Sequence, residues 1–450
     1  MTAAAAVDDP RARVVELLRR HGWNSTSFQI LEPGFRYWFD GDDACVGYVD
    51  TGGAWVAAAP IAERERLAEV SARFAAAAAE HGRRACCFAT EQRFVEATGW
   101  ESLRIGDQPH WTPQDWTSVT RSSKSLREQL RRARAKGVVV RTVTHDELAA
   151  DHPTRVRVEQ MIARWLATRQ IAPMGFLVQI DPFTLTAERR YFVAERDGKV
   201  VGFLGIIPIY ARRGWFFEDF IRDPDAPNGT VELLVDAGMR AAADAGIEHV
   251  TLGLVPLAGN VDRWLRAARR LGRALYDFDG LRAFKAKLKP RGWDPIFLSV
   301  PPGKSTLAAL YDTLTAFARN NMLRFGLETF LRGPAIVVRA LALLLVVWTV
   351  LLALPVSARF FPSPAWQYGW VAFDVVLAGA LLVLAQRWRR ALADVVAVAV
   401  TADAAITLVQ AIVYDLPRRT GVLDILVVLV AVLAPTLAAL MLWNARAHRV

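Results

Sequence analysis

Cysteine is scarce in this sequence: its 450 residues include only Cys45, Cys86 and Cys87. An odd number of cysteines with two of them adjacent fits neither a disulfide framework nor the ligand spacing of a metal site. The seven histidines are scattered along the chain. We therefore expect reduced, mostly buried cysteines, and neither a metal ion nor another cofactor.

Long apolar runs are missing from the first 334 residues, although 53% of the whole chain is hydrophobic. The N-terminal segment holds no apolar core long enough for a signal peptide. We therefore expect the first 300 residues to stay in the cytosol. The net charge of +10 and the isoelectric point near 9.8 favour a phosphate-rich partner, either a nucleic acid or an anionic membrane surface.

The apolar residues are concentrated in the last part of the chain, in four consecutive segments. These segments are residues 335–355, 370–386, 391–414 and 422–443. Each is close to the ~20 residues that a helix needs to cross a bilayer. The flanking arginines predict that both termini lie in the cytosol. The arginines that favour this orientation are Arg324, Arg332, Arg387, Arg389, Arg390, Arg446 and Arg449, and those that oppose it are Arg359, Arg418 and Arg419. We expect an all-α transmembrane domain of four helices over residues 335–450, in the bacterial inner membrane.

Two charged residues fall inside these apolar segments, Arg339 near the start of the first and Asp403 near the middle of the third. Intramembrane charge is costly and often functional. Four helices can equally pair such groups for packing, so the sequence leaves open whether Asp403 lines a path for lipid.

A linker helix is expected between the cytosolic and membrane parts, over residues 301–334. Its apolar residues recur at helical spacing, as Leu307, Leu310, Leu314 and Phe317. Such a helix either lies along the bilayer surface or serves as an ordinary amphipathic linker.

The cytosolic part contains two runs of alternating strands and helices. In the first run, strands are expected at 27–31, 35–39, 44–49, 54–58 and 84–89, with a helix at 62–81. In the second, helices are expected at 154–169 and 229–245, and strands at 191–196, 199–210, 214–221 and 248–254. The order strand, strand, strand, loop, helix, strand is that of a GNAT acyltransferase core. We expect a mixed α/β fold of two GNAT-like subdomains, over residues 1–120 and 121–300, of which the second is catalytic.

A strongly basic segment at 121–141 lies between the two runs, and Glu128 is its one acid. Its basic residues are Arg121, Lys124, Arg127, Arg131, Arg132, Arg134 and Lys136. Helical spacing places four of them on one face, which suits a phosphate backbone. The alternative is a solvated helix face, and the segment alone does not separate a tRNA from a lipid headgroup.

Residues 27–299 resemble the catalytic domain of the phosphatidylglycerol lysyltransferases, also called multiple peptide resistance factors. The matching stretches are GGAWVAAAPIA (52–62), SLREQLRRARAKG (125–137), APMGFLVQIDP (172–182), EDFIRDPDAPNGTVELL (218–234), VTLGLVPLAG (250–259) and DFDGLRAFKAKLKPRGWDP (277–295). The resemblance implies a tandem GNAT fold and transfer of an aminoacyl group, most often lysyl, from a charged tRNA to phosphatidylglycerol or another phospholipid. Such transfer lowers the binding of cationic antimicrobial peptides.

Two departures from the family pattern are visible. In the well-known members, membrane helices that include a flippase precede the catalytic domain, whereas here apolar segments only follow it. The resemblance therefore implies lipid synthesis, and the sequence leaves open whether this chain also flips lipid. In addition, the family usually has aspartate at the position of Glu232, so the aminoacyl group or the acceptor can differ.

Aminoacyl transfer requires orientation of two substrates, removal of a hydroxyl proton and stabilisation of an oxyanion. Asp219 is a candidate for the general base or for a ligand of the α-amino group, and Arg222 for binding phosphate or the oxyanion. Glu232 is the second candidate carboxylate. The alternatives are a structural Asp219–Arg222 ion pair and a Glu232 that only complements the helix dipole.

Further residues are candidates for substrate binding because they fall in the matching stretches. They are Asp181, Glu218, Asn228, Gly229 and Lys285. Gly229 is expected to begin the helix whose N-terminus attracts an anion. Lys285, with Lys287 and Lys289, is either near phosphate or on a solvated strand edge.

Two other functions compete with this interpretation. A GNAT enzyme that uses acyl-CoA or an acyl carrier protein binds pyrophosphate through an R/Q-x-x-G-x-G/A loop. That place holds RDPDAPNG here, and the one such string, Arg269–Ala274, lies later and within an expected helix. The other competitor is a membrane-anchored binder of tRNA or lipid that has no catalytic activity.

Overall fold

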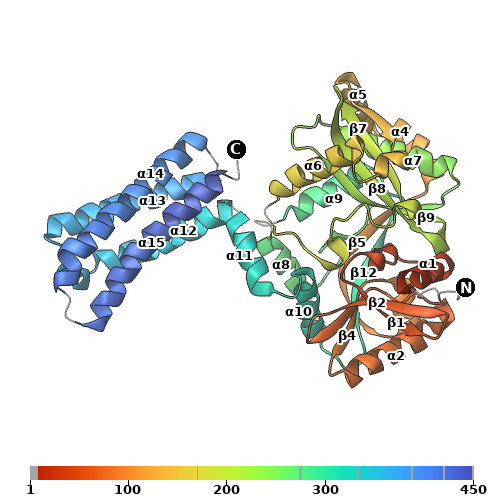
Figure 1. Cartoon of the computed structure of the whole chain (residues 1–450), viewed down its shortest axis with the longest axis horizontal. Coiled ribbons are helices and arrows are strands. Elements are labelled where there is room, and N and C mark those ends of the chain that lie inside the picture. Colours follow the sequence, from red (N-terminus) through yellow and green to blue (C-terminus); the bar gives the residue numbers. More distant parts are fainter. Residues whose placement is uncertain are drawn as a thin grey trace, which may run out of the picture. The chain divides into compact units, whose positions relative to one another are not determined.

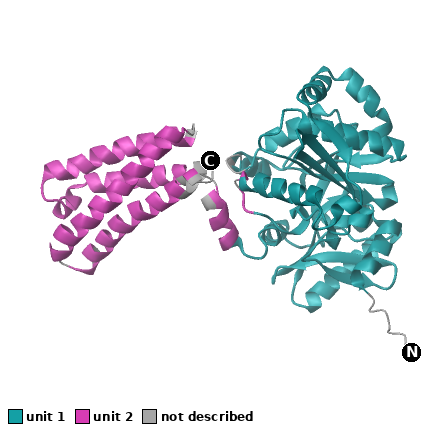
Figure 2. Cartoon of the chain, turned by 45° about the horizontal axis from the view of Figure 1, so that its top comes forward, with its two compact units in different colours: residues 1–167, 173–322 teal, residues 168–172, 323–450 magenta. Residues whose placement is uncertain are grey.

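The computed structural model describes residues 9–169, 171–272, 276–332, 334–386, 389–418 and 421–447. The chain forms two compact units (Figure 2). Unit 1 consists of Met1–Ala167 and Pro173–Met322, and unit 2 of Thr168–Ala172 and Leu323–Val450. Arg387, Arg419 and Arg449, which the sequence places beside the membrane helices, lie outside the described residues.

Unit 1 is built on a single sheet, in which twelve strands are described (Figure 1). The strands are β1 (Arg36–Asp40), β2 (Ala44–Asp50), β3 (Ala54–Ala57), β4 (Arg84–Glu91), β5 (Glu101–Trp111), β6 (Val139–Thr142), β7 (Arg190–Arg196), β8 (Lys199–Ile209), β9 (Gly214–Arg222), β10 (His249–Thr251), β11 (Val255–Pro256) and β12 (Gly292–Val300). Their order is β1-β2-β3-β4-β12-β5-β10-β9-β8-β7-β6, and β11 pairs with β5. The mixed α/β character expected from the sequence is confirmed.

Pairings made by β5 and by β12 join the parts of this sheet that the sequence assigns to separate subdomains. Strand β5 pairs antiparallel with β10, with Trp111 opposite Val250. Strand β12, the last of the unit, inserts between β4 and β5 and pairs with both. The expected boundary between residues 1–120 and 121–300 thus falls within one continuous sheet. The division into two subdomains stays a prediction.

Several expected elements of the first run are confirmed and one is wrong. Strands β1 to β4 lie close to their predicted bounds, and helix α2 covers Leu67–Glu80. The strand expected at 27–31 is instead the 3-10 helix η1 (Phe28–Leu31), whose four residues are all buried. A short apolar run fits a buried strand and a buried helical turn equally well, so the pattern did not distinguish them.

Helices cover both faces of the second half of the sheet. The helices of unit 1 are α1 (Pro10–His21), α2, α3 (Gln92–Thr98), α4 (Trp116–Ser122), α5 (Lys124–Ala135), α6 (Pro153–Ala167), α7 (Thr230–Asp244), α8 (Arg263–Gly272), α9 (Phe278–Lys287) and α10 (Thr306–Phe317). Neighbouring residues of a strand point to opposite faces. On β8, Leu204 packs in the core with α5 and α7, whereas Phe203 packs in the core with α6. The two apolar cores hold the strand β9 between them.

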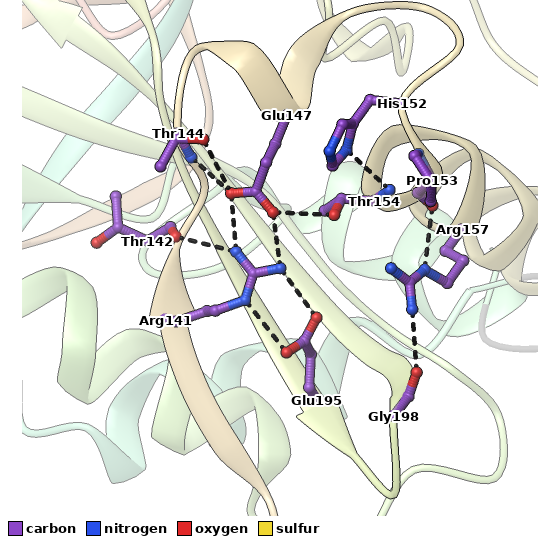
Figure 3. Close-up of polar contacts among 10 residues, drawn as sticks. All are labelled: Arg141, Thr142, Thr144, Glu147, His152, Pro153, Thr154, Arg157, Glu195 and Gly198. Atoms are coloured by element: carbon purple, nitrogen blue, oxygen red, sulfur yellow. Dashed lines mark hydrogen bonds and ion pairs between the residues drawn. The ribbon is translucent and has the colours of Figure 1, made fainter.

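An ion-pair network fixes the edge of the sheet beside α6 (Figure 3). Arg141 of β6 bonds Glu195 of β7 at 3.0 Å and Glu147 at 2.9 Å. Glu147 also accepts a hydrogen bond from the hydroxyl of Thr154 in the first turn of α6, at 2.9 Å. These bonds hold the pKa of Glu147 near 2, mainly because Arg141 donates to it, although partial burial opposes the shift. The network therefore links β6, β7 and α6 through charges that persist at neutral pH.

Unit 2 is helical. Its helices are α11 (Met322–Arg332, of which Met322 belongs to unit 1), α12 (Pro334–Ala353), α13 (Pro364–Gln386), α14 (Arg390–Gln410) and α15 (Val422–Ala447). Among the described residues, three stretches are long and apolar enough to cross a membrane, Pro364–Ala385, Arg390–Arg418 and Asp424–Trp443. Val338–Ala353 is a shorter apolar helix, so the fourth expected span stays a prediction. Asp403 accepts a hydrogen bond from Thr407 at 3.0 Å, and the roles of Asp403 and of the exposed Arg339 stay open.

Candidate active site

Strand β9 carries a bulge at the two acidic residues that the sequence singles out. Gly205 of β8 pairs with Asp219, whereas the next residue, Ile206, pairs with Phe217. Glu218 is therefore the extra residue of the bulge. A bulge redirects side chains that a regular strand would send to opposite faces. It allows Glu218 and Asp219 to reach the same buried polar cluster.

The centre of this cluster is Arg189, whose side chain is fully buried. Its guanidinium bonds the carboxylate of Glu218 at 2.6 Å and that of Glu32 at 3.3 Å, and its Nε donates to the main-chain oxygen of Thr184 at 2.8 Å. Glu218 also accepts a hydrogen bond from the amide of Gln29 at 2.7 Å. One cation thus holds two buried carboxylates in fixed positions.

A third carboxylate, Asp219, adjoins this pair. Asp219 is 8% exposed, and its carboxylate takes part in none of the hydrogen bonds or ion pairs described within residues 9–447. Burial and the charge of Glu218 raise the pKa of Asp219 well above its usual range, and Arg189 opposes them. Burial and Glu218 likewise raise the pKa of Glu32, to about 10. Three buried carboxylates against one guanidinium form a site that an additional cation would stabilise.

Two more of the expected residues lie in the neighbourhood of Asp219. The charge of Asp181, which is partly buried, raises the pKa of Asp219, so the two carboxylates interact. Arg222, at the end of β9, donates to the main-chain oxygen of Ala226 at 3.2 Å. Among the described contacts, Arg222 forms no ion pair with Asp219, so the alternative of a structural pair between them finds no support.

The turn after β9 brings the start of α7 against α5. Asn228 is exposed, whereas Gly229 is buried at the N-cap with φ of 96°. A Cβ atom on Gly229 would lie 2.2 Å from the main-chain oxygen of Gln129 in α5. Only glycine tolerates both this conformation and this approach. Gly229 therefore fixes the contact between α7 and the basic helix.

Glu232 and Lys285 have contacts of their own, and none of those described involves Asp219. Glu232, in the first turn of α7, forms an ion pair with Lys287 of α9. Lys285 is fully buried, and its Nζ donates to the main-chain oxygens of Leu252 and Gly253 at 2.6 and 2.9 Å. Burial lowers the pKa of Lys285 to about 7. The interpretation as a solvated strand edge is wrong for Lys285 and Lys287, because Phe278–Lys287 is the helix α9.

The basic helix expected from the sequence is α5, and it borders a groove of about 840 Å³. The basic residues that line the groove are Arg121, Lys124, Arg127, Arg131, Arg134 and, from α7, Arg240. Glu128 is bonded by both Arg131 and Arg132 at 2.9 Å. Lys136 is exposed at the end of α5 and is absent from this lining. The sequence thus predicted five of the six basic residues that the fold brings together here.

Glu32, Gln29 and Arg189 were missed by sequence reasoning. Glu32 and Arg189 are 157 residues apart in sequence and lie in no stretch that suggested chemistry. The available signal was a lone carboxylate directly after the apolar run FQIL and a charged residue directly before the apolar strand β7. A charge beside buried segments requires a partner, but the sequence does not identify it.

Comparison with known proteins assigns the chain to a family. Residues 15–299 match the family model described as the C-terminal part of phosphatidylglycerol lysyltransferase. The chain belongs to this family. The matched region contains the whole sheet except the last residue of β12, together with the carboxylate cluster and α5.

Relatives and solved structures agree with this assignment. The chain is 26% identical, over 281 residues, to the lysylphosphatidylglycerol biosynthesis bifunctional protein LysX of Gordonia bronchialis, covering 58% of this chain and 24% of the relative. It is 28% identical, over 165 residues, to the phosphatidylglycerol lysyltransferase of Bacillus subtilis, covering 34% of this chain and 19% of the relative. The chain thus spans a quarter or less of these relatives. The structure of L-PGS from Bacillus licheniformis superposes with a TM-score of 0.57 at 19% identity, covering 71% of this chain and 99% of that one. At this identity the likeness establishes the fold of the lysyltransferase family.

Proposed function

We propose that this chain transfers a lysyl group from aminoacyl-tRNA to the hydroxyl of phosphatidylglycerol. The observation that carries the proposal is the buried surplus of carboxylates around Arg189. A lysyl group carries an ammonium at the end of its side chain and an α-amino group next to the reacting ester. Both groups match a site in which Glu32, Glu218 and Asp219 share a single guanidinium.

Asp219 has the properties of a general base for this reaction. A base works best when its pKa lies near the working pH, and burial beside Glu218 raises the pKa of Asp219 well above its ordinary value. In the proposed step, the lipid hydroxyl oxygen attacks the ester carbonyl while Asp219 accepts the hydroxyl proton. The ribose oxygen of the tRNA leaves and takes that proton. Arg222, at the end of the same strand, is the candidate for binding phosphate or the oxyanion.

The groove beside α5 suits the donor. A tRNA backbone is bound by clustered cations because each contact releases counterions. Arg121, Lys124 and Arg127 are exposed on the groove, and Arg131 and Arg134 extend it. Lys136 lies further along, and we assign it a weaker, peripheral contact. The apolar helices of unit 2 support a multi-pass location in the inner membrane, where the acceptor lipid resides.

The test compares lipids from cells that express the intact chain, Asp219→Asn or Asp197→Asn. Asp197 is an exposed turn residue of the β7–β8 hairpin and serves as the matched control. A lipid with the mass of phosphatidylglycerol plus one lysyl residue is expected with the intact chain and with Asp197→Asn, and not with Asp219→Asn. A new lipid carrying an extra fatty chain would instead indicate an acyl-CoA enzyme. No new lipid from a folded, membrane-bound chain would favour a binding protein.

Dependence on tRNA is tested separately with membranes that contain the chain. Formation of the lysyl lipid is expected from purified lysyl-tRNA and not from free lysine with ATP. Ribonuclease added before the lysyl-tRNA should abolish the product. Product formed from free lysine would contradict the proposed donor.

A further inference from the structure

Helix α10 of unit 1 has an unusual distribution of side chains. Its large apolar residues Leu307, Tyr311 and Leu314 are 63%, 60% and 46% exposed. They follow one another at the i, i+4, i+7 spacing that forms a stripe on one face. The side chains that α10 buries against the sheet are small or polar, namely Ala309, Asp312, Thr313 and Ala316.

This distribution follows from how α10 is held. Asp312 is buried and bonds Arg84 of β4 at 2.6 Å, and Thr313 donates to the main-chain oxygen of Ala309 at 2.8 Å. The helix is thus held by this ion pair, by close packing of alanines, and by Leu310 and Phe317, which pack partly buried against the core. Its apolar stripe remains outside, although the orientation that would bury leucines is the usual one for a surface helix.

The chain after α10 continues the pattern. The first residues of α11, Met322 and Leu323, are exposed, and Leu327 one turn later is 57% exposed. The segment 301–334 contains four basic residues and two acidic ones. The apolar helix α12 begins 17 residues after the end of α10. Apolar stripes with flanking cations are typical of helices that lie in the interface of an anionic bilayer.

We propose that the exposed stripe of α10 inserts into the headgroup region of an anionic bilayer and holds unit 1 on the membrane surface. The occupant is a lipid surface because the stripe leads within a few turns into apolar helices and carries net positive charge around it. Lys304 and Arg319, which flank α10 and are exposed, interact with the anionic headgroups. Only the purpose of this contact rests on the proposed function: it would bring the catalytic cluster to the lipid that accepts the lysyl group.

Spin labels on the full-length chain in proteoliposomes test this inference. The native cysteines are buried, at most 1% exposed, so a nitroxide reacts selectively with an introduced surface cysteine. The labelled variants are Leu307→Cys and Leu314→Cys, and the matched control is Val139→Cys, an exposed apolar residue on the edge strand β6. Collision rates with oxygen, which concentrates in the bilayer, and with a water-soluble nickel chelate are measured for each.

In vesicles that contain phosphatidylglycerol, labels on α10 should collide on the order of tenfold more with oxygen, relative to nickel, than the label at Val139. In vesicles of neutral lipid the contrast should be smaller, because the flanking cations then lack their partner. Ratios on α10 equal to that at Val139 would overturn the proposal. Labels shielded from both reagents would overturn it as well, since they would indicate a protein partner or a second copy of the chain.

This readout does not depend on catalysis, so it separates the two proposals. If no lysyl lipid forms but the labels report contact with the bilayer, the proposed function is wrong and the proposal that α10 binds the membrane still stands. A double variant, Leu307→Ser with Leu314→Ser, tests whether membrane binding by α10 supports the transfer reaction. Its transfer to phosphatidylglycerol in vesicles should fall on the order of tenfold, because two exposed leucines no longer bind lipid, and transfer to lipid in detergent should not change.

Discussion

The carboxylate of Glu218 lies 2.6 Å from the guanidinium of Arg189, and neither side chain is more than 5% exposed. The next residue, Asp219, lies close enough to interact with the charges of both, but it does not bond Arg189 among the described contacts. The bulge in β9 thus produces two neighbouring carboxylates with different properties. One is bonded by Arg189, whereas burial and the charge of Glu218 raise the pKa of the other.

Loss of Arg189 should damage stability as well as activity. Arg189→Met would leave Glu32 and Glu218 buried without a cation, which costs about 3–5 kcal/mol for a buried pair. Arg196→Met, at the exposed end of the same strand, should cost less than about 1 kcal/mol because its pair with Asp197 is on the surface. Urea unfolding of the two variants, followed by tryptophan fluorescence, measures the difference. Equal midpoints would show that the Arg189 pairs contribute little.

The pH dependence of transfer should report Asp219. A base must be deprotonated to act, so the rate should rise as the pH rises through the raised pKa of Asp219, above the range of an ordinary carboxyl. Because the charge of Glu218 raises that pKa, Glu218→Gln should move the rising limb to lower pH. Asp181→Asn should move it in the same direction by less, since Asp181 contributes less to the shift. Initial rates of lysyl-lipid formation across pH, at saturating lysyl-tRNA, measure both shifts. A limb that stays in place in Glu218→Gln would argue against Asp219 as the base.

The groove beside α5 should determine how salt affects tRNA binding. Lys124→Ala combined with Arg127→Ala removes two phosphate contacts, so the slope of log K against log salt should fall by about two. Lys199→Ala, an exposed lysine at the start of β8, should leave the slope unchanged. Filter binding of tRNA over a range of salt concentrations provides the slopes. The same slope in all three proteins would place the tRNA elsewhere.

Gly229 and Gly137 allow steric contact to be separated from backbone conformation. Both have positive φ, but a Cβ atom on Gly229 meets the oxygen of Gln129 at 2.2 Å, whereas nothing lies within 4 Å at Gly137. Gly137→Ala should destabilise by about 1–2 kcal/mol from the left-handed conformation alone. Gly229→Ala should cost about 1–3 kcal/mol more, since α7 must shift away from α5. Thermal unfolding measures the loss of stability in each variant. Equal losses would mean that α7 shifts away from α5 at no cost in free energy.

Local patterns in the sequence predicted local structure well. The hairpin around Asp197 and Gly198 is confirmed, because a two-residue turn between apolar strands defines its own register. The basic face of α5 was predicted from helical spacing, and four of its basic residues border one groove, together with Arg121 of α4. Both features depend on residues that are close in the chain.

Features that depend on distant residues were not predictable in this way. Strand β12 pairs with β4 about 200 residues earlier, and no local pattern marks that pairing. The partners of Glu218 are Gln29 of η1 and Arg189, directly before β7, and the sequence shows only that each is charged or polar. Asp219 was a candidate because it lies near the end of an expected strand and in a stretch that matches the family, but the bulge that orients it became visible only in the register of two strands.

The position of β12 has a consequence for the order of folding. The strand lies between β4 and β5, so the sheet remains open between those two strands until residue 300 has been synthesised. Pairings across so many residues form slowly, and unpaired strand edges promote aggregation. The ribosome then proceeds directly to the apolar helices of unit 2. With the proposed membrane location of unit 2, closure of the sheet and delivery of the chain to the membrane compete within the same short interval of translation. Slower elongation after residue 300 would then give the sheet time to close first.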